Sequence, residues 1–530
     1  MTERRQHGTR AMMLGVVALV AMLLAPMAST AKQESTGGTL VGAFDVGPGG
    51  NPEQFNPLTA GAGFTWYEKY FSKLMLYNTD FSKIEGELAE SWELNDDATQ
   101  YTITLREGVL WHDGEAFTSE DVKFTIELAA NPESVSYIGA KFVGVTSIET
   151  PDEHTVVLNL EKPNATLLDA FTFLVMLPQH ALKDIAPAEL EKSDWWRTNP
   201  IGTGPFKWSK YEPGQFVELV AFDDYWRGRP KLDTIINRYF PEPGSSVIAL
   251  RAGDIAFTYM SADEARDLEG NADFTVLQGP SLVVNAFGFD LTDPRFQDKR
   301  VRQAFAYAID RKIMIDQLFQ GTATAVPCAY LLPQYLPAEF NAYEQDVEKA
   351  KSLLAEAGFD ASQPVEIVTY YADQLSQDVM VTVQQFLADV GVTIELRTTD
   401  TPGTYNDVVA DPAQWDMNYF GAANGPDPDV LSTHFESKES NPSVINRSNI
   451  ANPELDRLFA EGRQTVDPTA RAEVYKKICT IMNEEVYWVN MWVTTRFGGV
   501  SNAVENFVWT PAPGGGRYYD AAETWSVPAA

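Results

Sequence analysis

The chain has 530 residues, of which 40 are lysine or arginine and 74 are aspartate or glutamate, so its formal net charge is −34. Hydrophobic residues make up 44% and aromatic residues 12%, which is enough for several folding units and excludes an intrinsically disordered chain. The strong negative charge argues against nucleic acid as a partner and against docking on anionic lipid, because both need concentrated positive charge on the protein.

The N-terminus has the pattern of an export signal. Arg4, Arg5 and Arg10 precede an apolar run over residues 11–25, and small residues follow. This order is typical of a secretory signal peptide, and the run is shorter than the roughly 20 residues of a membrane-spanning helix. We therefore expect residues 1–31 to be cleaved after Ala31. No cysteine stands near this position, so no lipid anchor is expected.

The first clear elements follow from periodicity and capping. Residues 101–105 alternate apolar and polar side chains, which predicts a strand. Thr118 and Asp121 have the spacing of a capping box and predict the start of a helix.

Further along, Asp298 is expected to cap one helix, and Asp346 a second helix that stops at Gly358. A β-branched and aromatic run at 365–371, a helical pattern at 377–390 and a strand-like run at 392–396 then predict a βαβ unit. Such a unit implies a parallel sheet covered by helices, so the fold class is mixed α/β.

The chain has two cysteines, Cys328 and Cys479. In an oxidising compartment they can pair, but the sequence cannot show whether the two sulfur atoms approach each other. Pairing therefore stays open, and in either case we expect a structural role.

Motifs of known chemistry are missing. There is no phosphate-binding loop and no nucleophile elbow, and Gly202-Thr203-Gly204 lacks the third glycine of a dinucleotide-binding turn. The histidines are scattered, without the spacing of metal ligands. We expect no catalytic residue, no cofactor and no metal.

Asp427 and Asp429 flank Pro428 in one loop. Two carboxyl groups could serve glycoside cleavage, or they could contact a ligand. Side chains two positions apart around a proline usually diverge, and aspartate before proline is ordinary turn chemistry. A structural turn is therefore favoured over ligand contact, and both are favoured over catalysis.

Large aromatic side chains gather near expected loops and strand ends. They are Trp66, Tyr67, Trp195, Trp196, Trp415, Tyr419, Phe420, Trp488 and Trp492. Core packing explains any single one best, but aromatics also line ligand pockets. As a group, in an exported chain without catalytic motifs, they indicate binding rather than turnover.

Several segments, taken in order, resemble the dipeptide/oligopeptide-binding family of ABC-transporter solute-binding proteins, family 5. They are LAESWE (88–93), YTITLREGV (101–109), WHDG (111–114), FTSEDV (117–122), GTGPF (202–206), DYWRG (224–228), VRQA (301–304), AIDR (308–311) and KAKSLLAEAGF (349–359). They cover nearly the whole expected mature chain.

The resemblance implies a periplasmic-binding-protein fold of two lobes that close over a ligand about a hinge. Lobe I would comprise residues 39–75, 201–285 and 497–530. An extra subdomain, residues 76–200, would be inserted in it, and lobe II would comprise residues 286–496.

The resemblance also implies a function. The chain would be a monomeric, non-catalytic periplasmic receptor that delivers an oligopeptide-like or other mid-sized solute to the permease subunits of an ABC importer. Oligosaccharide-binding or opine-binding membership of the same family is the alternative. An exported glycoside hydrolase, and a scaffold or chaperone without small-molecule cargo, are more distant alternatives.

One position departs from the family pattern. Peptide-binding members place an aspartate just before the loop that corresponds to residues 424–429, where it pairs with the ligand's ammonium. This chain has Ala423 at that position. Either Asp427 or Asp429 substitutes for it, or the ligand has no free amino terminus.

Amide side chains such as Asn424 and Asn490 would instead suit a sugar. Trp488, Asn490 and Trp492 alternate at period two, so we expect all three to face one side of a strand. The candidate ligand-binding residues are Phe44, Trp66, Tyr419, Phe420, Asn424, Asp427, Asp429, Trp488, Asn490 and Trp492.

Overall fold

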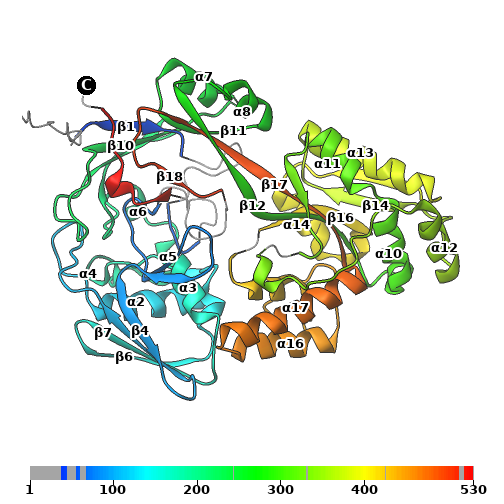
Figure 1. Cartoon of the computed structure of the whole chain (residues 1–530). Coiled ribbons are helices and arrows are strands. Elements are labelled where there is room, and N and C mark those ends of the chain that lie inside the picture. Colours follow the sequence, from blue (N-terminus) through cyan, green and yellow to red (C-terminus); the bar gives the residue numbers. More distant parts are fainter. Residues whose placement is uncertain are drawn as a thin grey trace, which may run out of the picture.

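The computed structural model describes residues 37–44, 55–59, 67–242, 244–329, 332–423, 425–511 and 519–528. The predicted signal peptide lies outside these ranges. Figure 1 shows two lobes connected by two long strands. These strands are β12 (Phe274–Phe289) and β17 (Trp488–Ser501), which are antiparallel neighbours in one sheet. The predicted two-lobed α/β architecture is therefore confirmed.

The first lobe contains a four-stranded sheet in the order β1-β10-β9-β8. Its strands are β1 (Thr39–Gly42), β8 (Phe206–Glu212), β9 (Phe216–Ala221) and β10 (Thr234–Arg238). Helices α7 (Ser245–Ala252) and α8 (Ala262–Leu268) and the short strands β18 (Val508–Trp509) and β19 (Tyr519–Asp520) belong to the same lobe. Alternate residues of β9, Val217 and Leu219, are buried in the core, as expected for a sheet with one apolar face.

A subdomain with its own antiparallel sheet, in the order β4-β5-β7-β6, interrupts this lobe. Its elements are β4 (Ala89–Leu94), β5 (Gln100–Leu105), α2 (Ser119–Ala130), β6 (Val145–Asp152), β7 (Thr155–Leu160), α3 (Leu167–Phe173), α4 (Gln179–Leu182), α5 (Pro187–Leu190) and α6 (Trp195–Thr198). The strand predicted at 101–105 is β5. The predicted capping box opens α2, where Asp121 Oδ2 accepts a hydrogen bond from Thr118 N at 2.9 Å.

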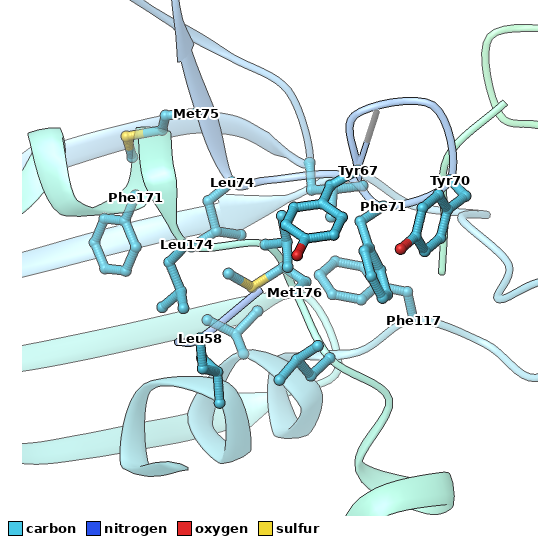
Figure 2. Packing of buried hydrophobic residues seen from close by; sticks show 14 of the residues in the cluster. Leu58, Tyr67, Tyr70, Phe71, Leu74, Met75, Phe117, Phe171, Leu174 and Met176 are labelled. Carbon is cyan, nitrogen blue, oxygen red and sulfur yellow. The ribbon is translucent and has the colours of Figure 1, made fainter. Parts of the chain in front are cut away.

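The inserted subdomain shares one apolar core with the rest of lobe I. Figure 2 shows Tyr67, Tyr70 and Phe71 beside Phe117 and Met176 of the subdomain, close to where the chain enters β2 (Met75–Tyr77), which pairs with β3 (Ile84–Gly86). At Gly202 a Cβ would lie 1.8 Å from the carbonyl oxygen of Tyr70. The Gly202-Thr203-Gly204 turn is thus needed for close backbone packing between these segments.

The second lobe is built on the far part of a seven-stranded sheet in the order β11-β17-β12-β16-β14-β15, with β13 also pairing with β17. The strands not yet given are β11 (Phe257–Met260), β13 (Ala323–Ala325), β14 (Val365–Thr369), β15 (Ile394–Thr398) and β16 (Met417–Ala423). β14 and β15 pair in parallel and are connected by α13 (Gln374–Asp389), which confirms the predicted βαβ unit.

Helices cover both faces of this sheet. One face packs an apolar cluster with α10 (Lys299–Ala308), α11 (Arg311–Leu318), α12 (Val347–Ala357) and α13, and the opposite face packs another with α14 (Pro402–Ala410), α15 (Ser432–Phe435), α16 (Pro453–Gln464) and α17 (Pro468–Glu485). The short α9 (Pro294–Gln297) precedes α10. Asp298 and Asp346 cap α10 and α12 as predicted, and Gly358 ends α12 with a φ of 66°.

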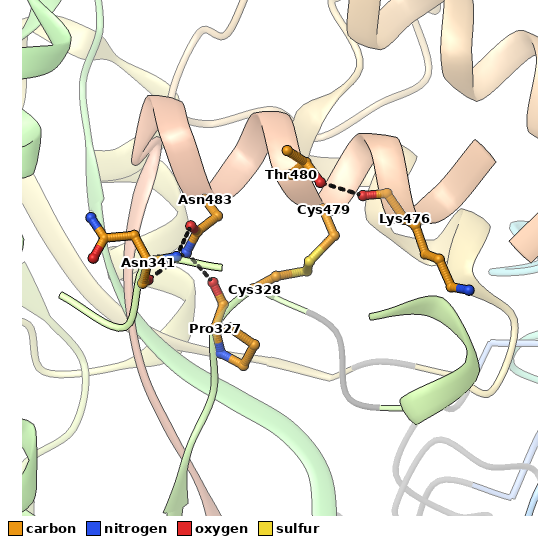
Figure 3. Close-up of a disulfide and its surroundings, with 7 residues drawn as sticks. All are labelled: Pro327, Cys328, Asn341, Lys476, Cys479, Thr480 and Asn483. Carbon is orange, nitrogen blue, oxygen red and sulfur yellow. Dashed lines mark hydrogen bonds between the residues drawn. A yellow bond between two sulfur atoms is a disulfide. The ribbon is translucent and has the colours of Figure 1, made fainter. Parts of the chain in front are cut away.

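The two cysteines form a disulfide bond. Cys328 follows β13, and Cys479 lies on α17, with 5.7 Å between their Cα atoms. Figure 3 shows that Asn483, one helical turn further along, donates hydrogen bonds to the carbonyl oxygens of Pro327 at 2.9 Å and Asn341 at 3.0 Å. The question that the sequence left open is thus answered, and the bond ties a connecting segment of lobe II to its longest helix.

Candidate functional site

The lobes meet at a short hinge. Strand β17 pairs with β11 of lobe I as far as Phe497 and with β13 of lobe II from Thr494. Thr495 and Arg496 lie between these two pairings, opposite Pro280 and Gly279 of β12. We call residues 279–280 and 495–496 the hinge segment. Because proline has no N–H to donate to the ladder, this is a weak point of the sheet.

Away from the hinge, the inserted subdomain touches lobe II directly. The backbone N–H of Ala165 donates to the carbonyl oxygen of Arg463 on α16 at 2.7 Å. The two lobes are therefore in contact both at the hinge and at the far side of the molecule.

Beside the contact of Ala165 with Arg463 lies a cavity of about 840 Å³ that residues of both lobes line. The inserted subdomain contributes residues around Lys141, Asn164 and Asp169, and lobe II contributes Asp427, Asp429, Ser432, Asn441 and Arg463 among others. We call this the inter-lobe cavity. Its lining mixes charged groups, hydroxyls, amides and apolar side chains, which suits a polar organic molecule.

Opposite charges face each other across this cavity. Lys141 Nζ lies 2.9 Å from Asp169 Oδ2, within the inserted subdomain. Burial would lower the pKa of Lys141, but the negative charges of Asp169 and, from lobe II, Asp427 and Asp429 outweigh it and raise that pKa. Lys141 thus stays protonated and attracts the loop of lobe II.

Asp427 is bound within lobe II. Its two oxygen atoms accept hydrogen bonds from the Arg471 guanidinium at 2.7 and 2.8 Å, and Oδ1 also accepts the N–H of Asp429 at 2.8 Å. Burial would raise the pKa of Asp427, but the adjacent Arg471 lowers it below its usual range. Its observed contacts are those of a structural turn, fixed to α17.

The carboxylate of Asp429 has fewer close hydrogen bonds than that of Asp427. Its Oδ1 accepts a hydrogen bond from Tyr475 Oη at 2.9 Å and lies 3.4 Å from Arg463, whereas Oδ2 has only a 3.5 Å contact to Ser432. Burial raises the pKa of Asp429 to about 6, against the opposing effect of Arg463. This carboxyl group therefore titrates close to physiological pH.

The aromatic candidates in lobe II are buried in its core. Tyr419 stacks on Phe287 with ring centroids 4.7 Å apart. On the other face of the sheet, Trp488 packs between Phe420 at 4.7 Å and Phe435 at 4.4 Å. These contacts are those of core packing, the interpretation that the sequence favoured for any single aromatic.

The expectation that Trp488, Asn490 and Trp492 face one side of a strand is wrong. In β17, Asn490 pairs with Ala286 and Trp492 with Asn285, so one residue is inserted relative to β12. This β-bulge reverses the alternation of side chains. As a result Trp488 belongs to one apolar cluster of lobe II and Trp492 to the cluster on the opposite face.

Asn490 is buried at the bulge, and its Oδ1 has no hydrogen-bond partner in the structure. It lines a small cavity of about 20 Å³ together with Arg311. That space is large enough for one water molecule.

The one described candidate from the first lobe, Phe44, is also a core residue. Phe44 is fully buried, edge-on to Tyr519 at 5.4 Å and with Lys69 Nζ 4.3 Å from its ring centre. Trp66 and Asn424 lie outside the described residues, so their predicted roles stay predictions.

The sequence did not single out Lys141, Arg463 or Arg496, all of which lie where the lobes meet. In the sequence, none of the three is part of a recognisable motif. Only the meeting of distant segments gives these residues a common location.

Within the described ranges, no helix has the length and apolarity that crossing a membrane requires. No group of three or more histidine, cysteine, aspartate or glutamate side chains there could hold a metal ion.

The chain matches known proteins over most of its length. A relative from Brucella melitensis, named a putative ABC transporter peptide-binding protein, is 41% identical over 520 residues, covering 96% of this chain and 98% of the relative. The oligopeptide-binding protein AppA of Bacillus subtilis is 25% identical over 538 residues, covering 96% and 97%.

The architecture agrees with these matches. The crystal structure of the ABC transporter substrate-binding protein CtaP from Listeria monocytogenes has a TM-score of 0.83 to this one at 26% identity, covering 93% of this chain and 99% of that chain. The family model described as "Bacterial extracellular solute-binding proteins, family 5 Middle" matches residues 83–442. The chain belongs to the family 5 solute-binding proteins of ABC transporters.

Proposed function

We propose that this protein captures a peptide-like solute between its two lobes and delivers it to the permease subunits of an ABC importer. It acts as a monomer in the periplasm, after removal of its signal peptide. Lobe I comprises residues 39–75, 201–285 and 497–530 with the subdomain 76–200, and lobe II comprises residues 286–496.

One observation carries the proposal: a cavity lined by both lobes lies between halves that only β12 and β17 connect covalently. A molecule in that space touches both lobes. It therefore stabilises the closed arrangement to the extent that it binds this arrangement better than the open one.

A peptide is the favoured cargo because both curated relatives described above are named for peptide binding. The cavity of about 840 Å³ falls in the range of sites for mid-sized organic ligands. Of the two loop carboxylates, Asp427 is occupied by Arg471, so Asp429 is the one that can accept the ammonium of a peptide.

An oligosaccharide is the second candidate, and the lining of the inter-lobe cavity supports it. Ser432, Thr433, Ser440, Ser443 and Asn441 present hydroxyl and amide groups there. Such groups can hydrogen-bond to the hydroxyls of a sugar.

Calorimetric titration and thermal unfolding of the mature protein test the function. The probes are an alanine oligopeptide series from dialanine to hexa-alanine, and a cello-oligosaccharide series. We expect at least one peptide to bind and to raise the melting temperature, since ligand at a hundredfold its Kd adds about 2.7 kcal/mol to the free energy of unfolding. Binding by cello-oligosaccharides alone would show that the cargo is a sugar and not a peptide. The absence of binding in both series would contradict solute capture.

Chromatography of the mixture after prolonged incubation tests the absence of turnover. We expect the bound probe to be recovered unaltered. Cleaved peptide or sugar would show that the protein is an enzyme.

A further inference from the structure

Arg496 is an arginine without an anionic partner at the point where the lobes join. It lies in the hinge segment of β17, opposite Gly279 of β12. Its Nη1 is buried and has no hydrogen-bond partner, and no ion pair joins it to another described residue. Its recorded contact is with the ring of Tyr259, whose centre lies 4.5 Å from the guanidinium carbon.

Other buried arginines of this chain are fully occupied. Arg471 binds both oxygens of Asp427 and the carbonyl oxygen of Gly462, and Arg302 binds Glu485 and the carbonyl oxygens of Phe296 and Gln297. Buried polar groups are normally satisfied, so an unbonded guanidinium nitrogen indicates a partner outside the chain, either a water molecule or a ligand.

The surroundings of Arg496 are held in place by lobe I. Tyr259 Oη accepts a hydrogen bond from Trp509 Nε1 at 3.2 Å and lies 3.0 Å from Tyr519 Oη. The aromatic ring beside the guanidinium is therefore held in place, and its contact with the guanidinium orients that group. The residue as a whole keeps partial exposure although Nη1 itself is buried, so a ligand would have to approach the guanidinium from its other side.

We propose that Arg496 is the anchor for a carboxylate of the solute, and thus that the cargo is an organic acid such as a peptide with a free carboxyl terminus. This inference rests on the proposed capture of a solute between the lobes. The planar fork of arginine matches the two oxygens of a carboxylate, and one cation suits one carboxylate better than a doubly charged phosphate.

The position of this anchor links binding to closure. An anion held at the hinge segment contacts β17, one of the two strands that connect the lobes. A carboxylate binds the guanidinium more strongly in the closed state, where water is excluded from the pair, than in the open state.

The test compares probes that differ only in the carboxylate. Titrations use trialanine and trialanine amide, and cellobionate and cellobiose, against the mature protein and Arg496→Met, Arg496→Lys and Arg447→Met. Arg447 is the matched control, because its guanidinium also lies over a tyrosine ring, that of Tyr405, but on the surface of lobe II.

We expect the unaltered protein and Arg447→Met to prefer an acid over its neutral counterpart by about 10-fold to 100-fold, the strength of a charge-assisted hydrogen bond. Arg496→Met should abolish this preference. Arg496→Lys, which keeps the charge but not the fork, should retain part of it. Unchanged melting temperatures of the variants without ligand confirm that the fold persists.

The outcomes separate the two proposals. If trialanine amide binds as well as trialanine, the anchor is wrong and peptide capture stands. If only cellobionate binds and its preference over cellobiose needs Arg496, the anchor stands and the peptide cargo is wrong. If Arg496→Met weakens acid and neutral probes equally, its role is structural and the anchor is wrong, and if no carboxylate probe binds, both proposals fall.

Discussion

At the scale of single residues, the loop aspartates have different roles although they are two positions apart. The buried Asp427–Arg471 pair fixes the loop to α17, with both side chains less than 10% exposed. Removing one member leaves an uncompensated buried charge, so we expect Asp427→Ala to lower the free energy of unfolding by about 3–5 kcal/mol.

Urea unfolding of the mature protein measures this loss. The double variant Asp427→Ala, Arg471→Met should be more stable than Asp427→Ala alone, because it removes both charges. If Asp427→Ala unfolded like the unaltered protein but bound peptide weakly, Asp427 would be a ligand contact and not part of a structural turn.

If Asp429 binds the ammonium group of the ligand, as proposed, ligand binding depends on pH. With its pKa near 6, the carboxyl group is mostly ionised at pH 7 and mostly protonated at pH 5. Since a ligand ammonium pairs only with the ionised form, we expect peptide affinity to fall by about five- to tenfold between these pH values. Titrations with trialanine at several pH values measure it, and Asp429→Asn should bind weakly and show no such fall.

The same pKa has the opposite consequence for folding. A folded-state pKa raised above the ordinary value of a carboxyl group means that the folded chain binds the proton more tightly than the unfolded chain does. Protonation of Asp429 therefore stabilises the fold, and this contribution is complete at low pH and lost as pH rises through 6. Affinity that rises with pH, while this contribution to stability falls, distinguishes a ligand contact from a purely structural carboxyl group.

At the scale of elements, the disulfide fastens a segment with little regular structure. Cys328 and Cys479 are 151 residues apart, and the bond closes a loop that contains most of lobe II. Long loops lose the most chain entropy on cross-linking, so we expect reduction to cost about 4 kcal/mol of stability.

Calorimetric melting with and without reductant measures that cost. The double variant Cys328→Ser, Cys479→Ser should melt like the reduced protein and should not respond to reductant. Equal melting of oxidised and reduced protein would show that the bond contributes nothing to the folded state.

Local signals in the sequence predict individual elements well. The caps at Asp298 and Asp346 and the stop at Gly358 each depend on a few neighbouring residues, and all three appear in the structure. The βαβ unit follows from the same kind of information, because a helix between two apolar strands leaves few other topologies.

Features that depend on pairing between distant strands were not predictable in this way. The bulge that turns Trp492 away from Trp488 arises from the register of β17 against β12, about two hundred positions earlier in the chain. Likewise the loop around Asp427 could be predicted as a turn, but its partner Arg471 lies on a helix that no local pattern relates to it. Arg496 became a candidate only when its surroundings were known.

At the scale of the whole molecule, the structure combines a narrow covalent connection with a second, non-covalent contact far from it. In the proposed function, the lobes move about the hinge segment, and the contact of the inserted subdomain with lobe II determines how firmly they stay together. Because the binding free energy of a solute includes the cost of closing the lobes, any residue that favours closure raises affinity without touching the solute.

Lys141 is the residue best placed to do this. It belongs to the inserted subdomain, pairs with Asp169 and is attracted by Asp427 and Asp429 of lobe II. In Lys141→Met the acidic side chains would face each other without a cation between them, so the lobes should separate more readily. We expect a larger radius of gyration in solution without ligand, and an affinity for trialanine that is lower by about fivefold or more, the range of a typical coupling free energy.

Small-angle scattering and titration measure the two effects on the same samples. The control Lys83→Met removes an equal charge from an exposed pair with Glu85, where 66% of the lysine side chain is exposed, and should change neither quantity. Because Lys141→Met also leaves the buried Asp169 unpaired, the double variant Lys141→Met, Asp169→Asn separates closure from local stability. It should restore the melting temperature but not the affinity, since the attraction between subdomain and lobe II is still missing. If affinity returned with the melting temperature, Lys141 would stabilise the subdomain alone, and closure would depend on the solute.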